Sequence, residues 1–301
     1  MIEFKTLETF LWVANLRSFR GAAEKLNTTQ PAVSMRIAQL EDALGTRLLE
    51  RDRRAVAPTQ KGKELLGYAE RALRLRAEMM DAVGDRTTMR GIVRLGVSET
   101  IVHTWLPLLI ERVHKSYPNL ELEIEVDISP NLRDRLLHKD LDLGFLLGPV
   151  GNPALQSRPL CSYPIGFVAS PKLGFKGGDA VPLAEVAKRP LITFSRNTQP
   201  YIALRELLDR AGLQATIHAS ASLATVVSMA LDGMGIAVIP PVIIGVVPPK
   251  GRLHEIKTDV RIPRFDYVVS WPATPDSFAA QKVAEIALGI AKTYKAGRPR
   301  D

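Results

Sequence analysis

The sequence contains a single cysteine, Cys161, among 301 residues. A lone thiol excludes an internal disulfide and fits a reducing compartment. A thiol-based redox sensor would also need a resolving cysteine in the same chain, and the sequence has none. We expect Cys161 to be a small buried thiol, with a redox sensor as the alternative.

Long apolar runs and secretion signals are missing as well. No run of apolar residues is long enough to cross a bilayer. The opening residues, MIEFK, do not begin a signal peptide. We therefore expect a cytoplasmic protein with no membrane partner.

Enzyme signatures are equally scarce. Ser98 lies in GVSET, which lacks the second glycine of a nucleophile elbow. The stretch 174–178 is too short for a phosphate loop and lacks its Lys-Ser/Thr ending. The five histidines, at positions 103, 114, 138, 218 and 254, have no paired metal-ligand spacing. We expect no catalytic residue, metal or cofactor; an enzyme stays the alternative if some turnover depends on Ser98.

What is present is an ordinary apolar fraction and a basic excess. A length of 301 residues predicts two or three compact units, and 46% hydrophobic with 24% charged residues is ordinary for a soluble protein. Its net charge is +8. The first 90 residues hold 16 Lys and Arg against 12 Asp and Glu, and the remaining 211 residues carry the same excess of four. The basic density is therefore higher at the N-terminal end, as a DNA-binding segment requires.

Residues 18–45 predict a helix, a tight turn and a second helix. Ser18 can cap the first helix, because its hydroxyl accepts an unpaired amide proton of the first turn. Apolar residues then recur at helical spacing. Residues 27–30 have turn and cap chemistry. Pro31 suits the first turn of the second helix, which Gly45 ends.

The second helix has an apolar face and an opposite face of small and polar groups. Residues spaced by four, three and four positions face inward: Val33, Ile37, Leu40 and Leu44. The outward face carries Pro31, Met35, Ala38 and Gln39, with Arg36 on its flank. This arrangement is typical of a helix-turn-helix that enters the DNA major groove. The alternative is an ordinary antiparallel helix pair.

A short two-stranded wing is predicted over residues 47–59. The segment RLLERDRR leads into AVAPT, with Arg51, Arg53 and Arg54 near the tip. Guanidinium groups at such a tip reach phosphates or a narrow minor groove. The wing therefore favours DNA binding over an ordinary helix pair.

The motifs of this segment follow one another in a fixed order. They are GAAEKLN at 21–27, TQPAVS at 29–34, Ile37, LE at 40–41, LG at 44–45, LLER at 48–51, PT at 58–59 and Gly62. This set resembles the N-terminal domain of LysR-type transcriptional regulators. The length, a two-part C-terminal region and the motif DGMGI at 232–236 extend the resemblance over nearly the whole chain. It implies a winged helix-turn-helix joined to a periplasmic-binding-protein-like effector domain.

A regulator of this type would contact double-stranded promoter DNA through the turn, the second helix and the wing. The candidate DNA-binding residues are Thr28, Thr29, Gln30, Pro31, Ser34, Met35, Arg36, Gln39, Arg51, Arg53 and Arg54. Many relatives have arginine where this chain has Met35, and methionine makes no bidentate contact to guanine. The resemblance also implies an interrupted palindrome, a dimer or tetramer, and contact with RNA polymerase.

Two more helices are predicted in the N-terminal part. One apolar face runs from Phe4 to Ala14, and this helix would pack behind the helix-turn-helix. A long helix is predicted from Thr59 to about residue 85. Its apolar residues follow three- and four-residue steps at Leu66, Ala69, Leu73, Met80 and Val83. That seam favours pairing with a second copy, which places two recognition helices about one DNA turn apart; the alternative is packing within its own domain.

From Gly91 the pattern changes to alternating strands and helices, including one helix over residues 101–116. Such alternation predicts an α/β fold with a mainly parallel sheet. We expect a winged helix-turn-helix domain at 1–58, a linker helix and hinge at 59–90, and a two-lobed effector domain at 91–301. Lobe 1 would hold about 91–161 and 268–301, and lobe 2 about 162–267.

A small-molecule site is predicted where two strands end before a helix, at residues 97–100 and 194–199. Hydroxyls and free amide groups at these helix starts suit a small organic or inorganic anion. Arg196 would add a positive charge if it turns inward, whereas Glu99 would disfavour an anion if it points into the cleft. The alternative is that Ser98 and Ser195 are helix caps only.

The resemblance favours Ser98 and Thr100 as effector contacts. The full candidate set is Ser98, Thr100, Ser129, Leu147, Ser195, Asn197, Thr198 and Ser222. We expect a sequence-specific transcriptional regulator controlled by an effector between two lobes. The alternative is a solute-binding protein whose N-terminal helices only drive oligomerisation; deleting residues 1–62 would then leave its function intact.

Overall fold

The computed structural model describes residues 2–52, 55–83, 89–175, 180–245, 253–272, 274 and 277–294. The chain divides into two compact units. The first holds residues 1–89 with 273–279, and the second holds 90–272 with 280–301. Within the described residues, no helix is both long enough and apolar enough to cross a membrane.

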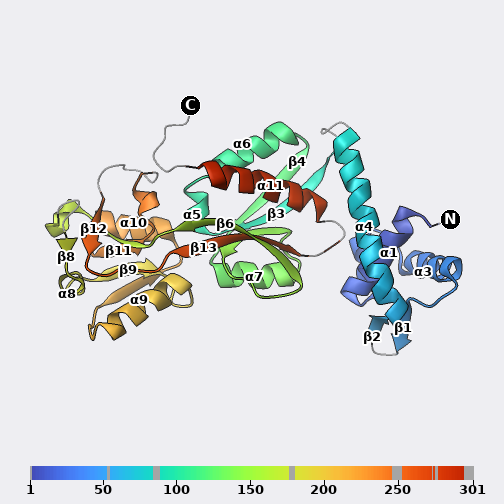
Figure 1. Ribbon diagram of the computed structural model, residues 1–301, viewed down its shortest axis with the longest axis horizontal. Helices are drawn as coiled ribbons and strands as arrows, with labels where there is room; N and C mark the ends of the chain where they lie inside the picture. Colours follow the sequence, from blue (N-terminus) through green and yellow to red (C-terminus); the bar gives the residue numbers. More distant parts are fainter. Residues whose placement is uncertain are drawn as a thin grey trace. The chain divides into compact units, whose positions relative to one another are not determined.

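The first unit contains three short helices, a two-stranded wing and one long helix (Figure 1). Its elements are α1 (Phe4–Leu16), α2 (Phe19–Lys25), α3 (Gln30–Leu44), β1 (Leu49–Asp52), β2 (Ala55–Pro58) and α4 (Gln60–Val83). Strands β1 and β2 pair antiparallel. This order confirms the helix-turn-helix, the wing and the long helix that the sequence predicts.

Capping residues set the boundaries of α2 and α3. The Ser18 hydroxyl accepts the Gly21 amide proton at 3.0 Å, and the Thr29 hydroxyl accepts that of Ala32 at 3.4 Å. These bonds satisfy donors that have no partner inside the helix. Gly45 ends α3 with φ at +64°, a conformation in which side chains with a Cβ are strained.

One apolar core holds the first unit together. Val33, Ile37 and Leu40 of α3 are each at most 1% exposed, and they pack with α1 and α2. Burying each such side chain contributes about 1.5–3 kcal/mol. Leu44 was expected on the same face but is 39% exposed, because it is the last helical residue and the chain turns at Gly45.

The long helix α4 crosses the start of the wing at Gly62. A Cβ on this residue would lie 2.1 Å from the carbonyl oxygen of Leu48. The amide of Thr59 donates to the same carbonyl at 2.9 Å, which holds the crossing in place. Only glycine allows the two backbones to come this close.

The predicted seam of α4 lies partly inside its own unit. Ala69 is 1% exposed and Leu73 is 9% exposed in the core, and Leu66 packs at its edge. For Ala69 and Leu73 the prediction of pairing with a second copy is wrong, since they are buried in the core of their own unit. The second half of α4 exposes large apolar side chains: Leu75, Met79, Met80 and Val83.

The second unit contains two mixed β-sheets (Figure 1). Each sheet forms a lobe together with the helices that pack on it, and we call these lobe 1 and lobe 2. The five-stranded sheet of lobe 1 has the order β4-β3-β5-β13-β6, and the six-stranded sheet of lobe 2 has the order β10-β9-β11-β7-β12-β8. In lobe 1 the strands are β3 (Gly91–Val97), β4 (Leu120–Val126), β5 (Leu143–Leu147), β6 (Leu155–Tyr163) and β13 (Phe265–Pro272). In lobe 2 they are β7 (Gly166–Ala169), β8 (Ala180–Val181), β9 (Leu191–Phe194), β10 (Ile217–Ser220), β11 (Ile236–Ile239) and β12 (His254–Thr258).

Helices cover both faces of each sheet (Figure 1). Lobe 1 has α5 (Glu99–Val102), α6 (Leu106–Ser116), α7 (Ser129–Leu137) and α11 (Phe278–Thr293). Lobe 2 has α8 (Leu183–Val186), α9 (Gln199–Arg210), α10 (Leu223–Leu231) and the 3-10 turns η2 (Pro171–Leu173) and η3 (Pro241–Gly245). Alternate residues of β5 show the two faces: Leu146 packs with α7, whereas Phe145 meets the ring of Trp105 at 5.4 Å.

Each sheet is parallel in one part and antiparallel in another. Strands β4, β3 and β5 run parallel, as do β10, β9 and β11. Antiparallel pairs involve β6, β7, β12 and β13. The mainly parallel prediction therefore holds where strands alternate with helices and for the β8–β12 pair. The strands that carry the chain between the two sheets, β6–β7 and β12–β13, add the antiparallel pairs.

The helix predicted over residues 101–116 is two helices. Helix α5 ends at Val102 and α6 begins at Leu106, with Pro107 in its first turn. Proline has no amide proton to donate to the carbonyl four residues earlier. A single helix cannot continue through this point, so a new one starts.

Candidate functional site

The outward face of α3 carries most of the residues expected to meet DNA. Pro31, Met35, Ala38 and Gln39 are exposed, Met35 by 59%. Thr29 and Gln30 are exposed at the start of the helix, whereas Thr28, Ser34 and Arg36 are half-buried. The helix therefore presents a continuous row of small and polar groups opposite its buried face.

Arg36 is turned toward α1. Its Nη1 donates to the Thr9 hydroxyl at 3.4 Å, and that hydroxyl donates to the carbonyl of Lys5 at 2.7 Å. This contact joins α3 to α1 on the flank of the outward face. The expected wing contacts Arg53 and Arg54, and the side chain of Arg51, lie outside the described residues.

Glu41 fixes the wing to α3. Its Oε1 accepts the amide protons of Leu48 at 2.8 Å and Leu49 at 3.2 Å. Hydrogen bonds to a charged acceptor are stronger than neutral ones. The sequence does not predict this role of Glu41, because a contact seven and eight positions along the chain has no helical or strand period.

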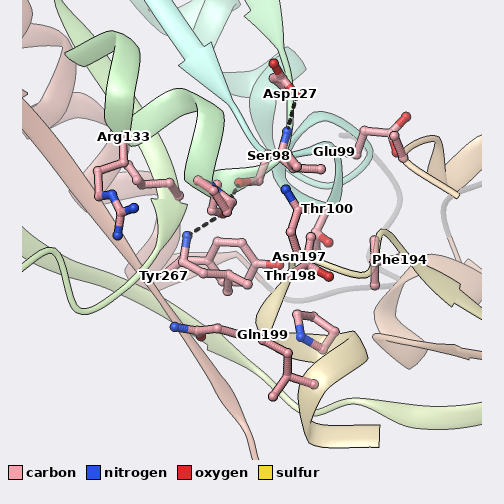
Figure 2. A pocket seen from close by; sticks show the side chains of 18 of the residues that line it. Ser98, Glu99, Thr100, Asp127, Arg133, Phe194, Asn197, Thr198, Gln199 and Tyr267 are labelled. Carbon is pink, nitrogen blue, oxygen red and sulfur yellow. Dashed lines mark hydrogen bonds between the residues drawn. The ribbon is translucent and has the colours of Figure 1, made fainter. Parts of the chain in front are cut away.

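A pocket of about 350 Å³ opens in the second unit where strands of the two sheets end (Figure 2). This volume suits a small organic molecule. Six of the predicted effector contacts line it: Ser98, Thr100, Ser129, Leu147, Asn197 and Thr198. Ser195, Arg196 and Ser222 do not line the pocket.

Three of these residues form one hydrogen-bonded chain in lobe 1. The Ser98 and Ser129 hydroxyls lie 3.2 Å apart, and the Ser129 hydroxyl accepts the Leu147 amide proton at 2.9 Å. Ser98 precedes α5 but its hydroxyl makes no cap bond. The alternative in which Ser98 serves only as a helix cap is therefore wrong.

The other two serines act within lobe 2. The carbonyl of Ser195 accepts from both the amide and the hydroxyl of Thr198, at 3.0 and 2.6 Å. Thr198, rather than Ser195, occupies the cap position of α9. The Ser222 hydroxyl caps α10 by accepting the Thr225 amide proton at 3.3 Å. Both serines therefore build the helix starts behind the pocket.

The pocket includes charged residues that the sequence did not single out. The Asp127 carboxylate accepts from the Ile128 amide at 2.7 Å and from Asn131 Nδ2 at 3.0 Å. Arg133 is half exposed and lies 3.6 Å from the Asp134 carboxylate. Asp127 continues the alternating pattern of acidic residues at 121, 123 and 125, which predicts an exposed strand face, and nothing in the local sequence marks Asp127 or Arg133 as pocket residues.

Tyr267 and Gln199 also line the pocket; Gln199 belongs to the predicted stretch 194–199, whereas Tyr267 was not predicted. Tyr267 comes from β13, and its side chain lines the pocket together with Thr100. Burial raises the pKa of Tyr267 well above its ordinary value, so the phenol is neutral at physiological pH. Gln199 Nε2 donates to the Gly148 carbonyl at 3.2 Å, which joins α9 of lobe 2 to the end of β5 in lobe 1.

Glu99 joins the lobes a second time. Its Oε2 accepts the amide proton of Leu223, the first residue of α10. Burial raises the pKa of Glu99, while the Leu223 bond and nearby His103 act in the opposite direction. In Figure 2, Glu99 and Arg133 stand on opposite sides of the pocket, with Tyr267 between them.

These charges decide what the pocket can hold. Its charged lining residues are Glu99, Asp127 and Arg133. Both carboxylates already accept hydrogen bonds from the protein, whereas Arg133 adds a partly exposed cation to a lining that also has apolar residues such as Ile128 and Phe194. The described residues contain no cluster of His, Cys, Asp or Glu that could hold a metal ion.

Cys161 lies outside the pocket lining, on β6. Burial raises the pKa of its thiol to about 12. The thiolate is the reactive form of cysteine. A protonated, half-buried thiol therefore supports the structural interpretation over the redox sensor.

Two family descriptions match most of the chain. "LysR substrate binding domain" matches residues 86–290, and "Bacterial regulatory helix-turn-helix protein, lysR family" matches residues 4–63. The regulator CzcR of Bacillus thuringiensis (strain Al Hakam) is 28% identical over 255 residues, covering 84% of this chain and 83% of its own. The regulator SoxR of an Arthrobacter species is 28% identical over 259 residues, covering 85% and 86%.

Solved structures share the fold at lower identity. A full-length OxyR variant from Pseudomonas aeruginosa superposes with a TM-score of 0.61 at 21% identity, covering 100% of this chain and 98% of its own. Full-length BenM gives 0.57 at 20% identity, covering 99% and 100%. Full-length CbnR complexed with its target DNA gives 0.51 at 20% identity, covering 95% and 100%.

Proposed function

Because this chain belongs to the LysR family of bacterial transcriptional regulators, we propose that it binds an interrupted palindrome in promoter DNA as a dimer or a dimer of dimers. Its DNA affinity or DNA bending responds to a small anionic effector held in the pocket of the second unit. It contacts RNA polymerase from that position and catalyses no reaction.

The observation that carries the proposal is the outward face of α3. Gln30, Met35 and Gln39 are exposed, while the opposite side of the same helix is anchored in the core. A helix that is rigidly held and polar outward can lie in a major groove and read base edges. Phosphate contacts would supply most of the affinity and make it salt-dependent.

The exposed apolar half of α4 supports self-association. Leu75, Met79, Met80 and Val83 offer apolar surface on a helix of 24 residues. Pairing of two such helices buries this surface and sets the separation of two recognition helices. CbnR, a structural neighbour, has been solved in complex with target DNA.

Arg133 supports an anionic effector. Its guanidinium is the pocket's one cationic lining group among the described residues, and polar groups such as Ser98 and Asn197 lie nearby. Arginine pairs with carboxylates through two parallel hydrogen bonds. A small carboxylate with an apolar body fits this combination of one cation and apolar walls.

A salt-titrated gel shift with the DNA upstream of this protein's own gene tests the proposal. Steep salt dependence with a sequence-specific footprint supports DNA regulation, and a small organic acid that changes the footprint supports the effector site. Absence of any shift at low salt contradicts it. A chain lacking residues 1–62 should lose the shift; if it retains all function, the solute-binding alternative is correct.

Met35→Arg sharpens the same test. Arginine at this exposed position can donate two hydrogen bonds to guanine, so we expect a preference of about 1–3 kcal/mol for operators with guanine at one position of each half-site. The measurement is competition binding among operator variants. Met234→Arg is the matched control, because Met234 is 57% exposed but lies in lobe 2. An equal change in both variants would mean that only net charge matters.

A further inference from the structure

Glu99 connects two parts of the second unit that are far apart in sequence. It is the first residue of α5 in lobe 1, and Leu223 is the first residue of α10 in lobe 2. The hydrogen bond from the Leu223 amide to Glu99 Oε2 joins residues 124 positions apart. Figure 2 shows the Glu99 side chain directed away from Arg133, at the other side of the pocket.

Three backbone amides at the start of α10 donate to acceptors within the chain. The Ser220 hydroxyl accepts the Ser222 amide proton at 3.1 Å, and the Ser222 hydroxyl accepts that of Thr225 at 3.3 Å. Glu99 takes the amide between them, at Leu223. A negative charge at this end of the helix is also favoured by the helix dipole. Two of the three acceptors come from lobe 2 itself, and only Glu99 crosses from lobe 1.

A second bond crosses the pocket in the opposite direction. Gln199 Nε2 of lobe 2 donates to the Gly148 carbonyl of lobe 1 at 3.2 Å. Each lobe therefore extends one side chain to a backbone group of the other, and both side chains line the pocket. The Gln199 bond is between neutral groups, whereas the Glu99 bond has a carboxylate acceptor and is the stronger type.

From this geometry we infer that Glu99 is an interlobe strut, which holds the lobes together before any effector binds and gives the pocket its shape in advance. The strut also occupies the α10 start, so an anionic group of the effector is directed toward the Arg133 side. A site shaped before binding loses less ordering entropy on binding. The inference rests on the proposed function only in naming the pocket an effector site.

Hydrogen exchange of the full-length protein without DNA or added ligand tests the strut. In Glu99→Ala, we expect the amides of residues 220–227 to exchange at least tenfold faster, because the Leu223 donor loses its acceptor. Glu99→Gln keeps an acceptor oxygen of the same reach and should show a smaller increase. Glu123→Ala removes an exposed glutamate from β4 of the same lobe and should stay within twofold of the unchanged protein.

A distance measurement separates a strut from a local helix cap. Spin labels would be placed at Lys115→Cys in α6 and Glu206→Cys in α9, in a Cys161→Ala background, with excess unlabelled chain to isolate distances within one copy. We expect one narrow distance distribution, which Glu99→Ala broadens and Glu123→Ala does not.

Unchanged exchange in Glu99→Ala would overturn the inference. Faster exchange with an unchanged distance distribution would also overturn it, since Glu99 would then be only a cap. Neither readout requires DNA binding. A chain that fails the gel shift but shows both effects therefore refutes the proposed function and keeps the strut.

Discussion

The recognition helix and the pocket are assembled in opposite ways. Helix α3 is one continuous segment with a cap at each end and one anchored face. The pocket takes residues from at least five separate segments of the second unit, including Ser98, Asp127, Leu147, Asn197 and Tyr267. Function at the first site is carried by residues adjacent in sequence, whereas function at the second depends on how two sheets meet.

The sequence separation between hydrogen-bonded residues differs between the recognition helix and the pocket. The caps of α2 and α3 join residues three positions apart. The bonds that join separate segments at the pocket span from 18 positions, at Ser129 and Leu147, to 124 positions, at Glu99 and Leu223. Local bonds can be read from spacing, and long-range bonds follow only from the tertiary fold. Four predictions test this contrast.

The largest expected effect on stability is at Gly62, where the first unit also depends on a contact between residues that are not close in sequence. Gly62→Ala places a Cβ against the Leu48 carbonyl, so we expect a loss of about 3 kcal/mol in unfolding free energy. Chemical denaturation of the full-length chain measures it. Gly67→Ala is the control, because no atom lies within 4 Å of its added Cβ, and it should stabilise by about 0.5–1 kcal/mol. Similar losses at both positions would show that the loss at Gly62 does not come from the close approach to the Leu48 carbonyl.

A smaller loss is expected when the wing is released from α3. Glu41→Ala removes the acceptor of the Leu48 and Leu49 amides, so we expect about 2 kcal/mol of destabilisation and weaker DNA binding. Denaturation and gel shift measure the two effects. Glu41→Gln retains an acceptor oxygen and should lose less than half as much. Equal losses in the two variants would assign the effect to charge instead.

The corresponding change in the pocket is Ser129→Ala. It removes the acceptor of the Leu147 amide, so we expect a loss of about 1.5 kcal/mol together with weaker effector response. Ser98→Ala is the paired variant, because it leaves that amide bonded and removes only the hydroxyl contact with Ser129. It should cost less stability. If Ser98→Ala loses more stability than Ser129→Ala, then Ser98 rather than Ser129 is the main stabilising residue of these hydrogen bonds.

The smallest effect concerns pH. The pKa of Cys161 is raised from 9.0 to about 12 in the folded chain, so between these values the folded state holds a proton that the unfolded state has lost. Stability should therefore fall as pH rises through this range, by about 1 kcal/mol at pH 10. Denaturation curves at pH 8 and 10 should show a steeper decline for the unchanged protein than for Cys161→Ala. Parallel declines would mean that the thiol ionises as readily in the folded state.

The recognition helix was predictable in detail because its determinants are local. Ser18, Thr29 and Gly45 mark the ends of helices by cap chemistry, and Val33, Ile37 and Leu40 mark the buried face by spacing. The prediction is wrong for Leu44, the last residue of α3, which was expected on the buried face but is exposed. Periodicity specifies which side of a helix is apolar but not how far its neighbours extend.

The remaining misses share one physical cause. Leu66, Ala69 and Leu73 would have the same spacing whether they packed against a second copy or against their own unit. In the structure they pack against the core of their own unit. The positions of the strand ends predicted Ser98 and Asn197 as pocket residues. They could not show that the Ser222 hydroxyl caps α10 instead of lining the pocket. The spacing of apolar residues predicts which face of a helix is buried. The tertiary fold determines which part of the protein packs against that face.

Strand β13 has a consequence for the order in which the second unit can be made. It lies between β5 and β6 in the sheet of lobe 1, and β6 has no other neighbour there. During synthesis, β6 therefore waits for about a hundred further residues, the whole of lobe 2 among them, before its partner emerges. Lobe 2 can pack around its own cores first, while the sheet of lobe 1 stays incomplete until residue 272 has left the ribosome. Contacts of such long sequence separation slow folding, and a chain truncated before β13 would expose the unpaired edges of both β5 and β6.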